Sequence, residues 1–484
     1  MKAEREKAIK ENQKTFNLFY NELPFIKPEE TLKFSRERDR LVEDIEKYVK
    51  WGYNRTKVDC TSLSKGCKTC GAGTWSCLFI NNKCNANCFY CPTSQNEYGN
   101  PTTQTVEFEN VEDYISYLRT FNFKGVSISG GEPFLSFDKS LHFITRIRES
   151  FGENMYIWLY TNGILATEEK LGLLKKAGLD EIRFDIGATG YNLEKVRLAK
   201  EIIPIVTVEI PAVPEDFQKL KDIVSELASL GVDHLNLHQI RCTEHNYKKL
   251  LKRNYTFLHG PKITVLESEL TALKLIKYVK QNKINIPLNY CSFIYKYRFQ
   301  RMAARRLFAP YVKRPYEEVT ETGIIRDLFI KGDKNDMDAQ FQMLKKCRKN
   351  DDFVLLNDGK ELHFKKKCWK EIDFIKFNVH VSYSKPFLLP AVSYRNIFKE
   401  IPLNSKKKVV VERSPLMKSY KMKLSERELY ETFFLNDEDN LKDYRHIDTV
   451  LGIHEEKGRV PRDVDFIVNV FDFEKLRWGL LDYY

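Results

Sequence analysis

The 484-residue sequence has no run of eighteen or more apolar residues, so it lacks the usual signature of a transmembrane helix. Its first residues, MKAEREKAIKENQK, are charged and contain none of the apolar stretch that a signal peptide needs. It also has no internal repeat and no low-complexity tract. These absences predict a cytoplasmic protein that does not act at a membrane.

Cysteine is sparse over most of the chain but dense in one segment. Seven of the 11 cysteines fall between Cys60 and Cys91. A secreted disulfide framework would instead spread its cysteines over a small domain. The concentration in a cytoplasmic-looking chain therefore indicates metal ligation.

The charge balance restricts the partners only weakly. The 79 basic and 67 acidic side chains give a net charge of +12, which permits nucleic acid or an acidic partner without requiring either. The lysines are dispersed in short runs, and such a distribution is typical of a solvated basic surface.

The sequence divides into four segments that differ in composition and in secondary-structure pattern. Residues 1–58 are charged and helical in pattern, and residues 59–300 contain the cysteine-rich segment and the strand–helix alternation. Residues 301–351 read as a basic helix and a polar linker or exposed loop. Residues 352–484 read as a β-rich or α+β accessory domain, with strand-like alternation in several stretches including 465–473.

The central segment predicts an α/β fold. Short β-branched runs alternate with amphipathic stretches, which indicates six β–α units, a parallel sheet and helices outside it. Chemistry on such sheets lies at the carboxyl ends of the strands. The expected strands cover residues 75–80, 125–130, 155–161, 181–187, 204–211 and 234–240.

Three closely spaced cysteines follow the first expected strand. The stretch KCNANCFYCP places them as Cys84-x3-Cys88-x2-Cys91. A structural zinc site needs four ligands, commonly two CxxC-like pairs. An iron–sulfur cubane on three thiolates instead leaves one iron open to a ligand, so this spacing indicates chemistry.

The next two strands end in polar turns. Gly130-Gly131-Glu132-Pro133 follows the second strand, and Thr161-Asn162-Gly163 follows the third. Adjacent glycines allow another group to approach the backbone closely. Cysteines, GGEP and TNG are therefore expected around one mouth.

CxxxCxxC followed by GGEP and TNG at successive strand ends resembles the radical S-adenosylmethionine (SAM) superfamily. GCKTCGAGTWSCLFINNKCNANCFYCP, VTVEIPAVPE and NYCSFIYKYRFQ are similar to a little-characterised group related to pyruvate formate-lyase activating enzymes. The resemblance covers about residues 75–300. It implies a partial (β/α)6 barrel, and the helical N-terminal extension and the β-rich or α+β C-terminal domain expected from the sequence pattern lie outside it.

The resemblance also implies the reaction. Cys84, Cys88 and Cys91 would hold a 4Fe–4S cluster whose open iron binds SAM. Reductive cleavage would yield methionine and a 5′-deoxyadenosyl radical that abstracts hydrogen from an unidentified substrate, a protein or peptide among the candidates. An electron donor such as flavodoxin or ferredoxin is implied. The chain has no DxHxxG motif of a cobalamin-binding domain.

Several residues match positions that bind SAM in the family. One departure is Gly187, which stands where related activating enzymes often have lysine, and Arg183 could replace that cation. The SAM-contacting residues implied by the resemblance are Tyr90, Gly130, Gly131, Glu132, Asn162, Asp185 and His238.

Three features keep two interpretations each. Cys60, Cys67, Cys70 and Cys77 could bind an auxiliary iron–sulfur cluster or zinc, or could form a short disulfide or remain free thiols. Cys291 would end a seventh strand, either as a hydrogen-atom donor or as a free buried cysteine. Glu209 could face the barrel mouth or pair with a lysine at the rim.

Other functions remain open at this level. One is a radical SAM enzyme that modifies nucleic acid. Another is an iron–sulfur module that binds nucleic acid through its basic C-terminal half without radical chemistry. The first expectation, radical chemistry, explains the GGEP and TNG strand ends, which a scaffold does not need. We expect the C-terminal domain to select or cover a macromolecular substrate.

Overall fold

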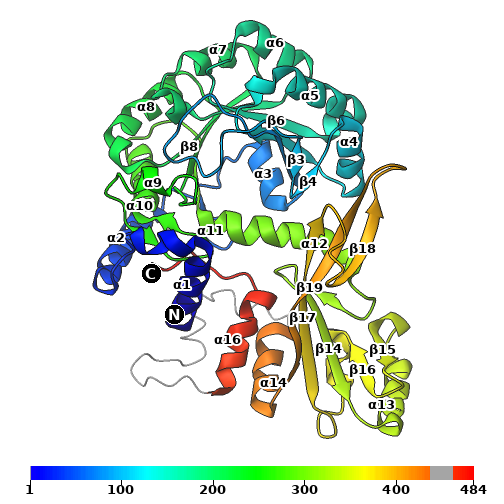
Figure 1. The fold of residues 1–484 in the computed structure, drawn as a ribbon. Coiled ribbons are helices and arrows are strands. Elements are labelled where there is room, and N and C mark those ends of the chain that lie inside the picture. Colours follow the sequence, from blue (N-terminus) through cyan, green and yellow to red (C-terminus); the bar gives the residue numbers. More distant parts are fainter. Residues whose placement is uncertain (1, 436–461, 484) are drawn as a thin grey trace. The chain divides into compact units, whose positions relative to one another are not determined.

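The computed structural model describes residues 2–435 and 462–483. The chain forms two compact units. The first contains the residues up to Gln300 and those from Gly479 onward, and the second contains Arg301–Trp478 (Figure 1). The second unit is therefore an insertion in the chain of the first. The N-terminal segment 1–58 belongs to the first unit, and residues 301–351 belong to the second.

The first unit is built on a ten-stranded sheet of order β1-β12-β9-β8-β7-β6-β5-β2-β3-β4. Seven central strands pair in parallel. They are β2 (Trp75–Asn81), β5 (Gly125–Gly130), β6 (Tyr156–Thr161), β7 (Glu181–Phe184), β8 (Ile205–Pro211), β9 (His234–His238) and β12 (Leu288–Cys291). Among the described strands β1 and β4 are the two edges, so the barrel is open. This confirms the predicted α/β partial barrel.

Three short strands complete the sheet by antiparallel pairing. β1 (Lys57–Val58) lies beside β12, whereas β3 (Thr102–Thr103) and β4 (Val106–Glu107) extend the sheet beyond β2. The sequence analysis expected β12 as the strand ending at Cys291, but it did not expect β1.

Side chains alternate along the central strands, which gives the two faces of the sheet different chemistry. On β8, Val206 and Val208 are fully buried against the helices outside the sheet. Thr207 and Glu209, one position along, point inward, because successive side chains of a strand point to opposite faces. The inner face of the barrel is consequently polar.

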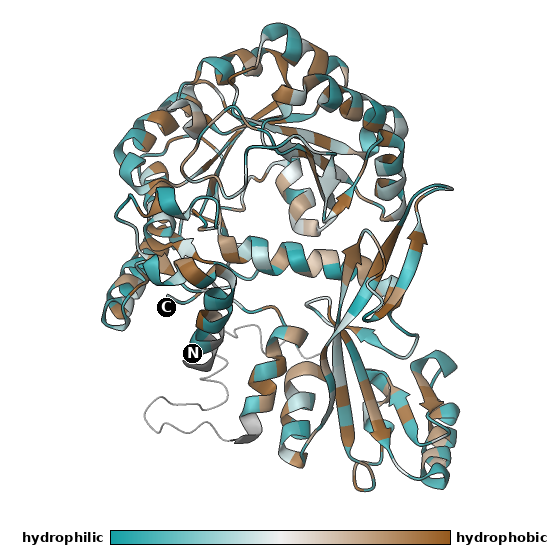
Figure 2. Cartoon of the chain, viewed as in Figure 1, coloured by the Kyte–Doolittle hydropathy of each residue, from teal (hydrophilic) through white to brown (hydrophobic). Residues whose placement is uncertain are grey.

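Helices cover the outer face of the sheet (Figure 1). Two of them begin at a side-chain cap: the Asn110 and Thr167 side chains accept hydrogen bonds from the third backbone N–H of α4 and α6. Figure 2 shows hydrophobic and hydrophilic faces on these helices. The covering helices are α4 (Val111–Thr120), α5 (Phe137–Phe151), α6 (Glu168–Lys176), α7 (Glu194–Ile202), α8 (Phe217–Ser229) and α10 (Leu266–Gln281).

One helix, α3 (Lys65–Ala72), lies on the inner side of the sheet (Figure 1). A Cβ on Gly66 would lie 2.4 Å from the Arg183 guanidinium, and a Cβ on Gly125 would lie 2.6 Å from the Thr69 side chain. Because Gly125 begins β5, α3 closes the amino-terminal end of the barrel. Two of the upstream cysteines lie on this helix.

Both ends of the described chain pack on the first unit. α2 (Pro28–Glu46), which follows α1 (Lys2–Phe16), lies along α10. The Tyr483 hydroxyl donates to Glu269 on α10 at 2.9 Å, and the Arg38 guanidinium on α2 lies 4.3 Å from the Tyr483 ring centre. The last described residues therefore belong to the same core as the first helices.

The second unit is α+β, as expected. Its antiparallel sheet has the order β15-β16-β14-β17-β19-β18, with β13 beside β14. The strands are β13 (Glu318–Val319), β14 (Ile325–Lys331), β15 (Phe353–Leu356), β16 (Glu361–Phe364), β17 (Val379–Leu389), β18 (Ile397–Pro402) and β19 (Lys408–Lys421). The helices are α12 (Arg301–Val312), α13 (Lys334–Cys347), α14 (Leu424–Tyr430) and α16 (Arg462–Glu474).

Two segments of the second unit differ from expectation. Residues 331–352 were expected to be a polar linker or loop but contain α13, in which Met337, Phe341 and Leu344 share one face that packs on the core of the second unit. The stretch 465–473 was expected to be a strand but lies in α16. Its buried residues follow helical spacing, at Phe466, Ile467, Val470 and Phe471.

No helix in residues 2–435 and 462–483 is both long enough and apolar enough to cross a bilayer.

Candidate active site

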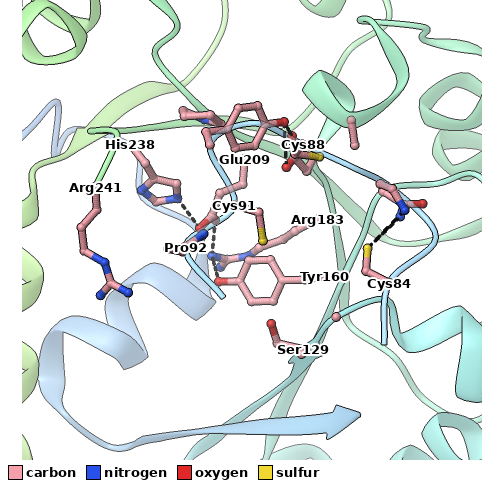
Figure 3. Close-up of a pocket in the computed structure, with 18 of the residues that line it drawn as sticks. Cys84, Cys88, Cys91, Pro92, Ser129, Tyr160, Arg183, Glu209, His238 and Arg241 are labelled. Carbon is pink, nitrogen blue, oxygen red and sulfur yellow. Dashed lines mark hydrogen bonds and ion pairs between the residues drawn. The ribbon is translucent and has the colours of Figure 1, made fainter. Parts of the chain in front are cut away.

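A cavity of about 380 Å³ lies at the carboxyl ends of the parallel strands (Figure 3). It brings together the cysteine triad and every residue matched to SAM binding. Of those residues, the cavity is lined by Cys84, Cys88, Cys91, Tyr90, Gly130, Gly131, Glu132, Asn162, Asp185 and His238, and Cys291 lines it as well. All its lining residues lie in the first unit. The motifs are separated in sequence but converge because parallel strands end at one edge.

The three cysteines lie in the loop that follows β2. Their thiols are free and partly buried. The Asn162 side-chain amide donates to the Cys84 sulfur at 3.8 Å, and the Ala86 backbone N–H donates to the same sulfur at 3.4 Å. The TNG turn thus contacts the cysteine loop directly.

The donor set fits an iron–sulfur cluster better than a single ion. Within the described part of the chain, no three His, Cys, Asp or Glu side chains are grouped closely enough to hold one metal ion. In a cubane each cysteine binds a different iron, so its thiolates stand farther apart than the ligands of one ion. Three thiols around one cavity match that requirement.

The two glycines are required by the cysteine loop itself. A Cβ on Gly130 would lie 2.1 Å from the Asn81 carbonyl oxygen, and a Cβ on Gly131 would lie 2.1 Å from that of Lys83. The backbone N–H of Glu132 donates to the Lys83 carbonyl at 2.8 Å. The end of β5 is thereby fixed against the residue that precedes Cys84.

Glu132 joins two strand ends. Its carboxylate accepts hydrogen bonds from the Thr161 hydroxyl at 2.8 Å and from the backbone N–H of Asn162 at 2.8 Å and Phe134 at 3.0 Å. Burial raises the pKa of Glu132, and these donors offset part of that rise. From the sequence, Glu132 was expected to contact SAM, and its hydrogen bonds between two strand ends were not predicted.

Tyr90 and Asp185 form a second link across the cavity. The Tyr90 hydroxyl donates to both Asp185 oxygens, at 2.9 and 3.1 Å. A Cβ on Gly187 would lie 2.5 Å from that hydroxyl. The glycine that replaces the lysine of related activating enzymes therefore leaves room for Tyr90.

A charged network covers the floor of the cavity (Figure 3). The Arg183 guanidinium donates to Glu209 at 2.8 Å and to Glu181 at 2.9 Å, while the other oxygen of Glu209 bonds the His238 imidazole. Glu209 thus faces the mouth and pairs with arginine and histidine instead of a rim lysine. The Arg183 guanidinium is held by these two carboxylates.

The network fixes the charges of its members. Burial raises the pKa of Glu209, but His238 and Arg183 outweigh it, so that pKa lies well below its usual range. Burial and Lys296 lower the pKa of His238, but Glu209 and Cys291 together raise it by more, and the net direction is upward. The floor therefore favours an ionised Glu209 between Arg183 and His238.

The upstream cysteines divide into Cys60, Cys67 and Cys70, which interact electrostatically with one another or with the same neighbour Tyr53, and Cys77, which lies apart. Asn236 donates to the Cys67 sulfur at 3.6 Å and Gln300 donates to the Cys70 sulfur at 3.3 Å, both at the inner helix α3. Cys77 lies on β2, where Ser127 and Ser129 lower its pKa against a larger rise from burial, to about 11 overall.

Sequence analysis missed Lys57. This residue is only 1% exposed, and its Nζ donates to Asn289 Oδ1 at 2.7 Å and to the Cys291 sulfur at 3.1 Å. In the sequence it is one lysine among many, and only the pairing of β1 with β12 brings it to Cys291. No local pattern could have found it.

Comparison with known proteins agrees with the site. Residues 78–200 match the family model "Radical SAM superfamily". A protein of Methanocaldococcus jannaschii named "Putative glycyl-radical enzyme activating enzyme" is 32% identical over 319 residues, which cover 63% of this chain and 81% of the relative. A GTP 3′,8-cyclase of Aquifex aeolicus is 32% identical over 119 residues, 24% of this chain and 36% of that protein.

Solved structures are more distant. Streptococcus suis SuiB bound to the precursor peptide SuiA has a TM-score of 0.36 and 15% sequence identity, and the match covers 54% of each chain. A TM-score of this size supports no conclusion about function. The sequence relationship to the archaeal protein spans 81% of that protein's length, and the family-model match at residues 78–200 includes the cysteine and GGEP segments. The chain therefore belongs to the radical SAM superfamily.

Proposed function

We propose that Cys84, Cys88 and Cys91 hold a 4Fe–4S cluster and that the cavity beside them binds SAM for reductive cleavage. The observation that carries the proposal is the convergence of the three thiols with the ends of six separate parallel strands on one cavity. When bound, the cluster supplies the electron that breaks a carbon–sulfur bond of SAM.

Residues of the chain would hold and orient SAM. The end of β5 at Gly130 and Gly131, the Asn162 amide and Tyr90 would surround the SAM molecule. The carboxylate of Asp185 is available to accept hydrogen bonds from SAM hydroxyls, and the imidazole of His238, whose pKa is raised, faces the same cavity. Rigid strand ends keep these groups in fixed positions, which lowers the ordering cost at the reaction.

The substrate is proposed to be a protein. Support comes from the name of the archaeal relative, which refers to activation of a glycyl-radical enzyme. All the residues that line the cavity precede Arg301, so the second unit adds an α+β body that the SAM site does not need. We assign to it the binding of the protein substrate, with a flavodoxin or ferredoxin as electron donor.

The prediction of an auxiliary cluster or zinc at Cys60, Cys67, Cys70 and Cys77 stays a prediction. Metal analysis of protein that lacks the triad tests it: residual iron or zinc would support the prediction, and metal-free protein would oppose it.

The central experiment compares two triple variants. Replacing Cys84, Cys88 and Cys91 with alanine should abolish the iron–sulfur absorbance of reconstituted protein and its formation of 5′-deoxyadenosine from SAM with a chemical reductant. The matched control replaces Cys242, Cys347 and Cys368, which lie outside the cavity. It should retain both signals. Formation of 5′-deoxyadenosine by the first variant would contradict the proposal.

A further inference from the structure

Lys57 and Cys291 stand opposite each other on neighbouring strands. The antiparallel pairing of β1 with β12 places them in direct register, and the parallel pairing of β12 with β9 places His238 beside Cys291 on its other side. The Lys57 ammonium donates to the Cys291 sulfur at 3.1 Å. The sulfur therefore lies between a lysine and a histidine.

The burial of Lys57 demands an anion. A buried ammonium is costly unless an opposite charge compensates it. Among the described residues no carboxylate forms an ion pair with Lys57. Its polar partners are the Asn289 amide oxygen and the Cys291 sulfur, and the Tyr295 ring lies 4.9 Å away. Of the two hydrogen-bonded partners only Cys291 can become negative, and the thiols of Cys67 and Cys70 act on Lys57 without a hydrogen bond to it. We therefore assign the hydrogen-bonded pair as an ammonium and a thiolate.

The electrostatics of both groups agree with this pairing. Burial raises the pKa of the Cys291 thiol, but Lys57 and His238 lower it to about 6. Burial lowers the pKa of Lys57, but Cys291, Cys67 and Cys70 together raise it by more, so its net direction is upward. The other titratable or charged groups around the Lys57–Cys291 pair are His238, Lys296, Cys60, Cys67, Cys70, Tyr53, Tyr290 and Tyr295.

Only the sulfur faces the cavity. Cys291 lines it together with the cysteine triad and the end of β5, whereas Lys57 does not line it. The nitrogen therefore lies behind the sulfur as seen from a bound ligand. A hydrogen from Lys57 can reach the cavity only through Cys291.

We propose that Lys57 and Cys291 together return a hydrogen atom to a carbon radical in this cavity. The proposal rests on the radical SAM function assigned above. A thiolate has no hydrogen on sulfur, so Cys291 alone cannot be the donor expected from sequence. The lysine supplies the missing proton along the 3.1 Å hydrogen bond.

The step balances in electrons and protons. One N–H bond of Lys57 breaks as the proton moves to the sulfur, and the resulting S–H hydrogen atom forms the new C–H bond. A neutral amine and a neutral thiyl radical remain. One electron from a low-potential protein donor and one proton from solvent then restore ammonium and thiolate. If the sulfur lost an electron while Lys57 kept its proton, a buried ammonium would remain without a counter-charge. The transfer of the proton from Lys57 and the loss of the electron from sulfur are therefore coupled.

The charge state is tested first, by alkylation of the full-length chain with iodoacetamide without oxygen or SAM. Peptide mass spectrometry follows Cys291 across pH. We expect half-maximal alkylation near pH 6 in wild type and an upward shift of about two pH units or more in Lys57→Met. Lys57→Arg keeps the charge and should keep the low midpoint. Cys242, buried with its pKa raised to about 12 chiefly by burial, is the internal control.

Hydrogen return is tested with SAM itself as the probe. Reconstituted enzyme cleaves SAM in D2O with dithionite and no other substrate, and the deuterium in 5′-deoxyadenosine is measured. Wild type should yield singly deuterated product. The labelled fraction should fall by about tenfold in Cys291→Ala and in Lys57→Arg, because a guanidinium retains its proton. Cys242→Ala should match wild type.

Three results would overturn the proposal. One is an ordinary alkylation midpoint for Cys291 in wild type. Another is undiminished labelling in Cys291→Ala, and the third is undiminished labelling in Lys57→Arg with its low midpoint retained. Failure of wild type to cleave SAM would overturn the proposed function and, with it, the relay. The alkylation result is independent of cleavage and separates these failures.

Discussion

The Tyr90 hydroxyl donates a hydrogen bond of 2.9 Å to Asp185, and so connects the cysteine loop to the end of β7. Tyr90 lies between two cysteines of the triad, whereas Asp185 lies 95 positions away in sequence. The bond controls the charge of the carboxylate that faces the SAM cavity. Asp185 has its pKa raised to about 6, chiefly by burial, and the Tyr90 bond lowers it toward that value.

Tyr90→Phe should therefore make SAM binding more sensitive to acid. The ionised form of Asp185 is lost as pH falls through its pKa, so wild-type affinity should decline below about pH 6. Without the hydroxyl the pKa rises further, and the decline should begin at higher pH. Equilibrium dialysis with SAM between pH 5 and 8 measures both curves. Tyr98→Phe, at an exposed residue, is the control. Identical curves for Tyr90→Phe and wild type would contradict the assignment.

Gly131→Ala should displace the cysteine loop. Its Cβ would meet the backbone of Lys83 at 2.1 Å, and backbone atoms cannot move aside as a flexible side chain can. We expect lower iron content after reconstitution and a free energy of unfolding reduced by about 1 kcal/mol or more. The control, Gly172→Ala in α6, meets no atom within 4 Å and should stabilise the helix by up to about 1 kcal/mol. Normal iron content in Gly131→Ala would refute the steric argument.

Arg183→Met should destabilise the first unit strongly. It leaves the fully buried Glu181 and the pocket-facing Glu209 without their shared cation, which typically costs about 3 kcal/mol or more. Denaturant unfolding measures the loss. Arg146→Met removes an exposed ion pair and should change little. The double variant Arg183→Met/Glu181→Gln should recover part of the loss, and no recovery would argue against charge as the cause.

Excision of the second unit should leave a folded SAM site. Gln300 can be joined to Gly479 by a short glycine linker, because the neighbouring Arg298 donates to the Gly479 carbonyl at 2.8 Å. This protein should form 5′-deoxyadenosine with a chemical reductant. A chain that simply stops at Gln300 loses Tyr483 and its bond to Glu269, and its melting temperature should be lower. Equal melting temperatures would show that the returning segment contributes nothing.

The parts of the site that sequence could predict are those encoded by local motifs. The triad, GGEP and TNG each lie within a few residues, and the strand pattern alone places their turns at one edge. The cavity lined by Cys84, Gly131 and Asn162 follows from that reasoning. The internal role of Glu132 did not follow, because its partners are backbone N–H groups whose directions depend on the folded turns.

The pairing of strands that lie far apart in the chain could not be predicted from the sequence. Lys57 is significant only because a two-residue strand pairs with β12, and no periodicity exists in two residues. The prediction of a strand at residues 465–473, which lie in α16, was wrong for a related reason. In the stretch 465–473, apolar residues occupy both alternating and helical positions, and only packing of Phe466, Ile467, Val470 and Phe471 in one core selects the helix.

The return of residues 479–483 to the first unit has a consequence for biosynthesis. Glu269 on α10 and Arg38 on α2 obtain their contacts to Tyr483 only after the whole inserted unit has been translated. Domains commonly fold in order as they leave the ribosome. Here the residues up to Gln300 keep part of their core uncovered until the inserted unit has been translated, whereas the inserted unit can fold first. Chaperone dependence during synthesis should accordingly be greater for the first unit than for the second.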